Sequence, residues 1–307
     1  MLRSAMLAVA RIGAVRRGLV AFPPTRTVVD RFVSGETLDD CVRVVRRLAD
    51  QGILTTVDHL GEDVTDAATA RATSDAYLAL IARLQQEGLT ASCEVSIKLT
   101  AFGLALPGGE EIAYANAERV CAAARAAGTT VTVDMEDHTV TDATLAIVDR
   151  LREGYPETGT VLQAYLLRTP ADCARYATPG SRIRLCKGAY DEPASVAHRD
   201  RARVDAAYLE CLRILMKGEG YPMVASHDPA MIEAALAYAD LVGRAPGTFE
   251  LQMLYGIRTD EQRRLAALGH RVRAYVPYGT DWYGYFTRRL AERPANLAFF
   301  LRALVGR

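Results

Sequence analysis

The hydrophobic pattern of the chain alternates between short β-rich runs and longer segments with helical spacing, from residue 52 onward. The runs are eight in number and cover residues 53–58, 92–99, 129–134, 160–166, 182–187, 222–226, 249–254 and 272–276. Eight strand–helix units predict an α/β fold, a (β/α)₈ barrel. A doubly wound open sheet is the alternative, but no GxGxxG motif follows an early strand.

Start and stop signals support the helices between these strands. Residues 259–262, Thr-Asp-Glu-Gln, read as a capping box, and Thr169 and Asp228 each stand before a proline as predicted N-caps. Glycines stand where four helices should end, at Gly88, Gly128, Gly243 and Gly269. Residues 99–109 read as an irregular loop. We predict a helical extension over residues 1–36 and one barrel domain over residues 37–307.

Composition narrows the class of protein. The 307 residues are half hydrophobic and carry 37 basic and 37 acidic side chains, a balance that argues against a nucleic-acid partner. No apolar run reaches the roughly 18 residues that span a bilayer. The six scattered cysteines form no CxxC pair, which is typical of reduced thiols in a cytoplasmic protein rather than of disulfides or zinc ligands. The arginine-rich first 29 residues favour packed amphipathic helices, with a peripheral membrane contact as the alternative.

Polar residues at the predicted carboxyl ends of the strands mark a candidate active site. In a (β/α)₈ barrel these ends meet at one mouth, where catalytic residues lie. The residues are Asp58, Lys98, Asp134, Gln163, Lys187, His227, Gln252 and Tyr275. The sequence therefore predicts a polar mouth that binds a small molecule.

The cations at this mouth leave two chemistries open. Lys98 is one of only three lysines and is either a Schiff-base nucleophile, as in barrel aldolases, or a plain cation for a carboxylate. Arg184 and Lys187 precede a glycine and suit a bound phosphate or the anion of a reduced flavin. His227 is expected to form hydrogen bonds rather than to ligate a metal, because no other histidine has zinc spacing.

Two adjacent arginines, Arg288 and Arg289, lie on a final segment that has an apolar stripe. A pair of guanidinium groups beside such a stripe usually meets an anion, and a small carboxylate matches the planar fork of donors. The segment is therefore predicted to bind a carboxylate.

Nine ordered motifs give the chain a family resemblance. They include Val95-Ser-Ile-Lys98-Leu, Arg184-Leu-Cys-Lys187-Gly-Ala-Tyr190, Tyr275-Val-Pro-Tyr-Gly279 and Arg288-Arg289-Leu-Ala-Glu292. From about Thr37 to its end the chain resembles the monofunctional bacterial proline dehydrogenases and the corresponding domain of proline utilization A. The resemblance implies a distorted (βα)₈ barrel whose final helix covers the active site.

The resemblance also implies roles for single residues. Arg288 and Arg289, with Lys98, would hold the proline carboxylate, Tyr275 and Tyr278 would contact the substrate, and Asp134 would organise the cationic cluster beside the flavin. The residues implied to contact FAD are Asp134, Gln163, Arg184, Lys187, Gly188, Ala189, Ser226, His227 and Gln252. Asp228 and Cys186 depart from the residues common in the family, asparagine and valine.

The implied reaction is oxidation of L-proline to Δ1-pyrroline-5-carboxylate, with hydride passing from proline C5 to flavin N5. Electrons would then pass to a quinone, which implies a cytoplasmic protein that meets the inner face of the cytoplasmic membrane. A separate pyrroline-5-carboxylate dehydrogenase would act next. Besides the aldolase, a barrel that binds proline without turnover is the remaining alternative.

Overall fold

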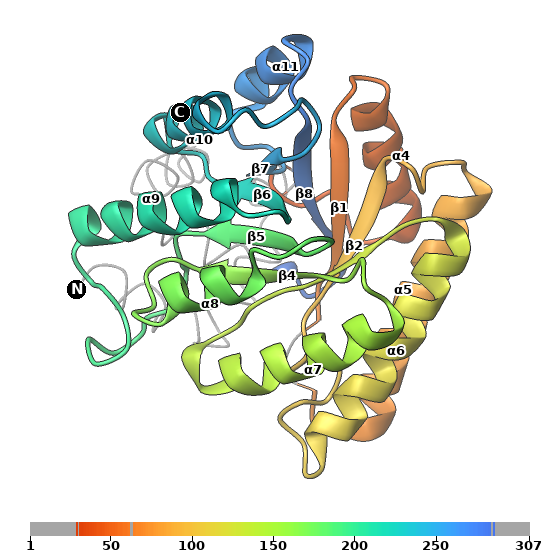
Figure 1. The fold of residues 1–307 in the computed structure, drawn as a ribbon. Helices are drawn as coiled ribbons and strands as arrows, with labels where there is room; N and C mark the ends of the chain where they lie inside the picture. Colours follow the sequence, from red (N-terminus) through yellow and green to blue (C-terminus); the bar gives the residue numbers. More distant parts are fainter. Residues whose placement is uncertain (1–28, 30, 62–63, 284, 286–307) are drawn as a thin grey trace, which may run out of the picture.

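The computed structural model describes residues 29, 31–61, 64–283 and 285 (Figure 1). Eight parallel strands form a closed barrel in chain order, and β1 pairs with β8 from Leu54↔Arg273 to His59↔Tyr278. The strands are β1 Leu54–His59, β2 Cys93–Ile97, β3 Val131–Val133, β4 Gly159–Gln163, β5 Arg182–Cys186, β6 Tyr221–Ala225, β7 Glu250–Leu254 and β8 Val272–Tyr278. The predicted α/β barrel and all eight predicted strands are confirmed, and the open sheet is excluded because its two edges are paired.

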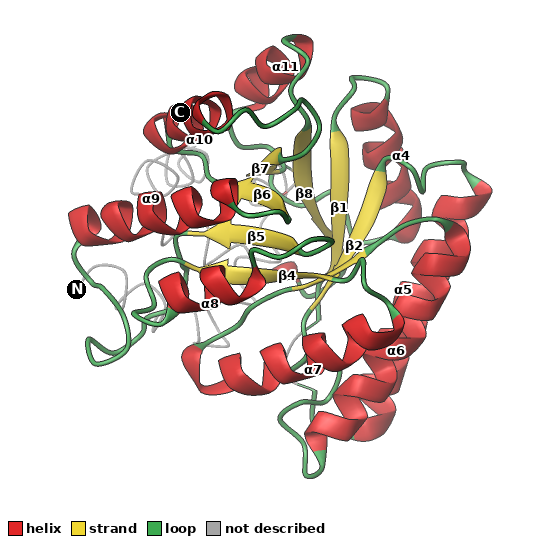
Figure 2. Cartoon of the chain, in the orientation of Figure 1, coloured by secondary structure: helices red, strands yellow, loops and turns green. Residues whose placement is uncertain are grey.

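Helices surround the barrel and connect each strand to the next (Figure 2). The helix before β1 is α4, Leu38–Ala49. The connecting helices are α5 Ala67–Gln86, α6 Gly109–Ala127, α7 Thr141–Gly154 after the short η1 His138–Val140, α8 Thr169–Tyr176, α9 Arg201–Lys217, α10 Pro229–Leu241 and α11 Thr259–Ala267. The predicted extension over residues 1–36 is described only at 29 and 31–36, and the final helix only near its start, so both stay predictions.

The helix-boundary predictions were partly wrong. Asp228 is the N-cap of α10, as predicted, with its carboxylate accepting from Ala230 N. Thr169 is instead the first residue of α8, and its hydroxyl donates to the Gln163 carbonyl. The predicted capping box at residues 259–262 does not form, because the Gln262 amide is buried and donates to carbonyls of the preceding turn. The four predicted stop glycines all have positive φ.

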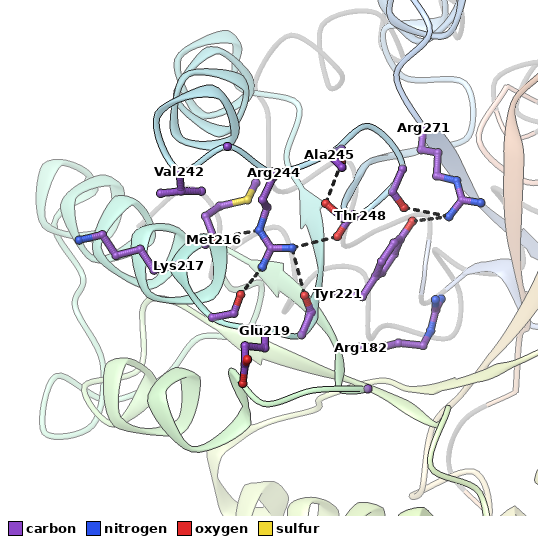
Figure 3. Close-up of a pocket in the computed structure, with 15 residues that line it drawn as sticks. Arg182, Met216, Lys217, Glu219, Tyr221, Val242, Arg244, Ala245, Thr248 and Arg271 are labelled. Carbon is purple, nitrogen blue, oxygen red and sulfur yellow. Dashed lines mark hydrogen bonds between the residues drawn. The ribbon is translucent and has the colours of Figure 1, made fainter.

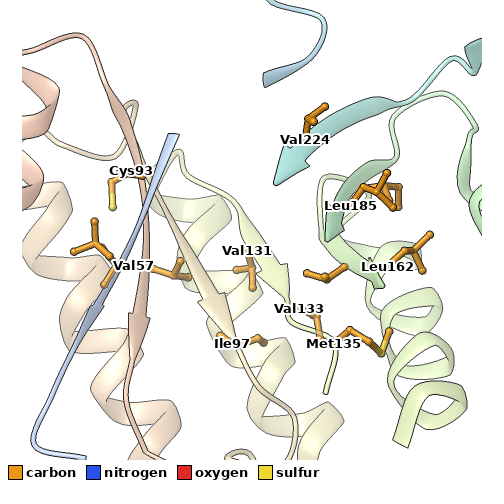
Figure 4. Packing of buried hydrophobic residues seen from close by; sticks show 14 of the residues in the cluster. Val57, Cys93, Ile97, Val131, Val133, Met135, Leu162, Leu185 and Val224 are labelled. Carbon is orange, nitrogen blue, oxygen red and sulfur yellow. The ribbon is translucent and has the colours of Figure 1, made fainter. Parts of the chain in front are cut away.

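The hydrophobic core lies outside the barrel, between strands and helices (Figure 4). Val57, Val95 and Val133 come from three neighbouring strands and are completely buried in this layer. Full burial of such a side chain stabilises a fold by about 1.5–3 kcal/mol. Because successive strand residues point to opposite faces, the alternate residues of the same strands point into the lumen, and many of these are polar.

Candidate active site

Four of the predicted site residues meet at the carboxyl ends of the strands. Asp134 follows β3, and its Oδ1 accepts from Arg184 Nη1 on β5 at 2.5 Å. Its Oδ2 accepts from the hydroxyl of Tyr275 on β8 at 2.6 Å and lies 4.0 Å from Nζ of Lys98, which follows β2. The structure therefore brings together residues separated by as many as 177 positions.

Lys98 is paired with a second carboxylate, Asp58 of β1, at 2.6 Å. The Asp58 side chain is 1% exposed, and this burial raises its pKa even though Lys98 opposes the shift. The Tyr77 hydroxyl donates to Asp58 as well, at 3.3 Å. The pair places an ammonium group, itself 12% exposed, beside the mouth of the barrel.

Arg184 is held on all three of its nitrogens. Its Nε donates to Gln252 Oε1 at 2.7 Å, and its Nη1 donates to Ser96 Oγ at 3.0 Å in addition to Asp134. Its Nη2 donates to Glu94 Oε1 at 3.3 Å. The guanidinium carbon lies 5.3 Å from the centre of the Tyr275 ring. Such a contact and the two carboxylates fix the direction of a buried cation. Arg184 is 3% exposed, and burial opposes the charge while Asp134 and Glu94 raise its pKa above the ordinary value.

A layer of charged residues below this cluster was not predicted. The residues are Glu94, Arg182, Glu250 and Arg273. Arg273 Nε lies 2.6 Å from Glu250 Oε1. Burial alone would raise the pKa of Glu250, but the positive charge of Arg273 outweighs burial and lowers that pKa. Each of the four residues of this layer stands two positions before a residue of the upper cluster on the same strand face, namely Ser96, Arg184, Gln252 and Tyr275. That spacing of two was the signal that the sequence offered.

Lys187 leaves the lumen and joins two helices. Its Nζ pairs with Asp205 of α9 and, at 2.8 Å, with Asp228, the N-cap of α10. The hydrogen bond from Lys187 is the main cause that lowers the pKa of Asp228. Gly188, the residue after Lys187, has φ 120° and packs against the Tyr165 ring. A Cβ at this position would lie 2.2 Å from that ring. Ala189 follows it and is half-buried. This turn is thus fixed by an ion pair on one side and an aromatic ring on the other.

The other predicted cofactor residues line the same end of the barrel and bind backbone groups. Gln163 Nε2 donates to the Glu136 carbonyl at 2.7 Å. Ser226 Oγ accepts from Asp228 N at 3.1 Å, and His227 Nε2 accepts from Leu254 N at 2.9 Å. These bonds hold the loops after β3 and β6 in place.

Tyr278 is a predicted site residue that the structure does not bring into this cluster. Tyr278 points to the opposite face of β8 from Tyr275, where it is buried in the core with its ring 5.0 Å from that of His59. Arg288 and Arg289 lie outside the described residues.

A separate hollow of about 640 Å³ lies at the amino-terminal ends of β5 and β6 (Figure 3). It is lined by Arg182, Tyr221 and Arg271, and by Arg244, which donates hydrogen bonds to five backbone carbonyls. Two of these carbonyls, those of Leu215 and Met216, belong to the last turn of α9, so Arg244 ties the helix to neighbouring loops. The hollow is at the end of the barrel remote from the candidate active site.

Other kinds of site are not indicated in the described ranges. They contain no cluster of three or more His, Cys, Asp or Glu that suits a metal ion. None of the helices within them is long and apolar enough to cross a bilayer. Five of the six cysteines are buried, and Cys186 is partly exposed.

Comparisons with known proteins agree on one family. A family model described as proline dehydrogenase matches residues 41–302. Proline dehydrogenase of Deinococcus radiodurans is 40% identical over 281 residues, which cover 91% of this chain and 90% of that protein. Proline dehydrogenase 1 of Bacillus subtilis subsp. natto is 38% identical over 284 residues, 92% of each chain.

Solved structures agree on the fold. The chain superposes on the crystal structure of proline utilization A from Bdellovibrio bacteriovorus, a protein inactivated by N-propargylglycine, with a TM-score of 0.79 and 24% identity. The match covers 91% of this chain but only 33% of that larger protein.

Proposed function

The chain belongs to the proline dehydrogenase family, and on this premise we propose that it oxidises L-proline to Δ1-pyrroline-5-carboxylate with FAD as its cofactor. The observation that carries the proposal is the cluster of Lys98, Asp134, Arg184 and Tyr275 at the carboxyl end of the barrel. It joins cations for an anionic substrate and cofactor to a ring that can pack on a small heterocycle.

The proline carboxylate is bound by cations in this proposal. Arg288 and Arg289 supply two planar guanidinium forks, which match a carboxylate better than an ammonium does. Lys98 supplies a third positive charge, and its pairing with Asp58 keeps that charge at the mouth. Substrate binding then fixes the orientation of the ring and displaces water from the site.

Tyr275 and Asp134 shape the space for the ring. Tyr275 is half-buried, and its hydroxyl donates to Asp134, so its ring has one preferred orientation. A fixed ring of this size packs on proline and excludes larger or hydroxylated rings. Asp134 has its oxygens engaged by Arg184, Ser96 and Tyr275, which suits an organising role rather than attack on the substrate.

The residues near Arg184 fit a flavin nucleotide. FAD is anionic at its pyrophosphate, and its ring system gains negative charge on reduction, so it needs cations and hydrogen-bond donors. Arg184 and Lys187 supply the cations, and Gln163, Ser226 and His227 supply polar groups at the adjacent strand ends. Gly188 and Ala189 offer backbone with little side-chain bulk, while Gln252 acts through its bond to Arg184. When bound, FAD supplies the acceptor for the hydride that leaves proline C5.

The electron acceptor and the cellular setting complete the proposal. We propose that a quinone reoxidises the enzyme, that the protein is cytoplasmic and touches the membrane surface to reach it, and that a separate pyrroline-5-carboxylate dehydrogenase uses the product. Reoxidation by a soluble quinone analogue, measured anaerobically by stopped flow, should be saturable. Reoxidation by oxygen alone would count against the quinone.

The absorbance spectrum of the purified protein tests the main proposal. A flavin spectrum that bleaches on anaerobic addition of L-proline is the expected result. A flavin that stays oxidised would remove proline as the substrate and leave a binding protein. A protein without flavin, even after FAD is added, would favour the aldolase, and borohydride trapping at Lys98 would then identify it. The ion pair with Asp58 argues against that chemistry, because a Schiff-base lysine attacks as the neutral amine.

A further inference from the structure

Eight charged side chains form one connected network in the lumen of the barrel. The carboxylates are Asp58, Glu94, Asp134 and Glu250, and the cations are Lys98, Arg182, Arg184 and Arg273. Within the described part of the chain, the four negative and four positive charges therefore cancel. The network runs from the mouth of the barrel to the hollow at its opposite end, where Arg182 is a lining residue.

Glu94 is the centre of this network. Its Oε2 lies 2.7 Å from Arg182 Nη2, and its Oε1 lies 3.3 Å from Arg184 Nη2 and 3.9 Å from Arg273 Nε. Three threonine hydroxyls donate to its carboxylate, those of Thr56, Thr130 and Thr132. Burial by itself would raise the pKa of Glu94, but the three guanidiniums outweigh it and lower this pKa to about 2. Glu94 is thus a fixed negative charge inside the barrel.

Arg184 connects Glu94 with the candidate active site. One edge of its guanidinium faces Glu94 and another faces Asp134, at 3.3 Å and 2.5 Å. Glu94 therefore limits both the direction of Arg184 and the positive field that Arg184 presents at the mouth. Charges act over longer range in a buried lumen than in water, because the effective dielectric constant is lower.

We propose that Glu94 is a positioning residue that acts through Arg184 to set the reduction potential of the bound flavin. The inference rests on the proposed function, in which Arg184 lies beside the flavin. Reduction adds negative charge to a flavin, so a more positive lumen stabilises the reduced form relative to the oxidised form. Loss of the Glu94 charge leaves one uncompensated cation and should raise the potential. Loss of the Arg182 charge leaves one uncompensated carboxylate and should lower it.

The test compares Glu94→Gln, Arg182→Met and the double variant. Arg182 is a suitable partner because it pairs with Glu94 at 2.7 Å and its side chain is 17% exposed at the far end of the lumen. The potential of each FAD-loaded protein is measured by equilibration with a reference dye during dithionite reduction, which does not require proline. We expect the ratio of affinities for reduced and oxidised flavin to change about tenfold, which corresponds to a shift of ~30 mV in the potential of a two-electron couple. The potential should rise in Glu94→Gln and fall in Arg182→Met. The double variant should return close to the parent.

A purely structural role predicts a different pattern. It would lower stability and FAD affinity in both single variants, with potentials that stay unchanged or move in the same direction, and either result would overturn the proposal. If Glu94→Gln does not fold, Arg182→Met is compared with Arg182→Lys, which keeps the charge. A lower potential for the methionine variant alone supports the proposal, and equal potentials refute it. Failure of proline to reduce the parent flavin would overturn the proposed substrate but leave this measurement intact.

Discussion

The hydrogen bond between Tyr275 and Asp134 gives the sharpest prediction for the site. Tyr275→Phe removes only the hydroxyl, which lies 2.6 Å from Asp134 Oδ2. A hydrogen bond to a charged group contributes about 1.5–3 kcal/mol. The Asp134 side chain is 12% exposed, so water replaces part of the bond and the lower end of this range applies. We expect Tyr275→Phe to lower the free energy of unfolding by about 1.5 kcal/mol.

Asp134→Asn should cost more, because it also weakens the contact with Arg184 Nη1 at 2.5 Å. Breaking a buried ion pair costs about 3–5 kcal/mol, and the remaining contacts of Arg184 with Glu94 and Gln252 place the loss near the low end. In the Asp134→Asn background, Tyr275→Phe should then cost less than about 0.5 kcal/mol, because the charged acceptor is already gone.

Urea unfolding of the four proteins, followed by circular dichroism, measures this coupling. The slope m should stay constant, so that differences in midpoint report stability. Tyr278→Phe is the matched control, since its ring lies on the opposite face of the same strand and its effect should add to that of Asp134→Asn. Losses for Tyr275→Phe and Asp134→Asn that add within about 0.3 kcal/mol would refute the bond.

Three further predictions concern the carboxylate site, the turn after β5 and the lumen. Arg288→Lys and Arg289→Lys should each raise the KM for proline roughly tenfold, because lysine lacks the planar fork; steady-state kinetics equal to the parent would contradict this. Gly188→Ala should lower the free energy of unfolding by about 2–4 kcal/mol, since a Cβ would lie 2.2 Å from a tyrosine ring at φ 120°. Gly128→Ala is its control, with φ 77° and open space, and an equal loss would show that the ring contact is unimportant. Because the pKa of Glu94 is lowered from 4.5 to about 2, its carboxylate contributes stability that is fully present above pH 4.5. This stability is lost as the pH falls toward about 2. Glu94→Gln should therefore flatten the acid side of the stability curve in pH-dependent urea unfolding, and an unchanged slope would contradict the assignment.

Strand order and the mouth of the barrel were predictable because both depend on local pattern. Runs of apolar residues located each strand, and the polar residue at the end of a run located Lys98 and Asp134, whereas Tyr275 lies in the middle of β8. The chemistry at strand ends follows from the fold, so a correct strand count was enough to group them.

The charged layer of the lumen was missed because its partners are distant in sequence. Glu94 and Arg182 are 88 positions apart, and their pairing depends on the register of strands that local pattern does not reveal. A lone Glu94 within an apolar run looks costly to bury, and only its partners make it stable. The capping box at residues 259–262 failed for a related reason, since the Gln262 amide donates to the carbonyls of Leu254 and Ile257, which lie outside the helix.

The position of Arg273 on the last strand has a consequence for the order of folding. Its guanidinium pairs with Glu250 and donates to the carbonyl of Thr55 on the first strand, across 218 positions of chain. A partly assembled barrel without β8 would hold four carboxylates against three cations, so its lumen would carry one uncompensated negative charge. Docking of β8 removes that charge and joins the sheet edges in one event. Intermediates that lack only the last strand should therefore be sparsely populated, and the barrel should form late and cooperatively, as its long-range pairing also favours.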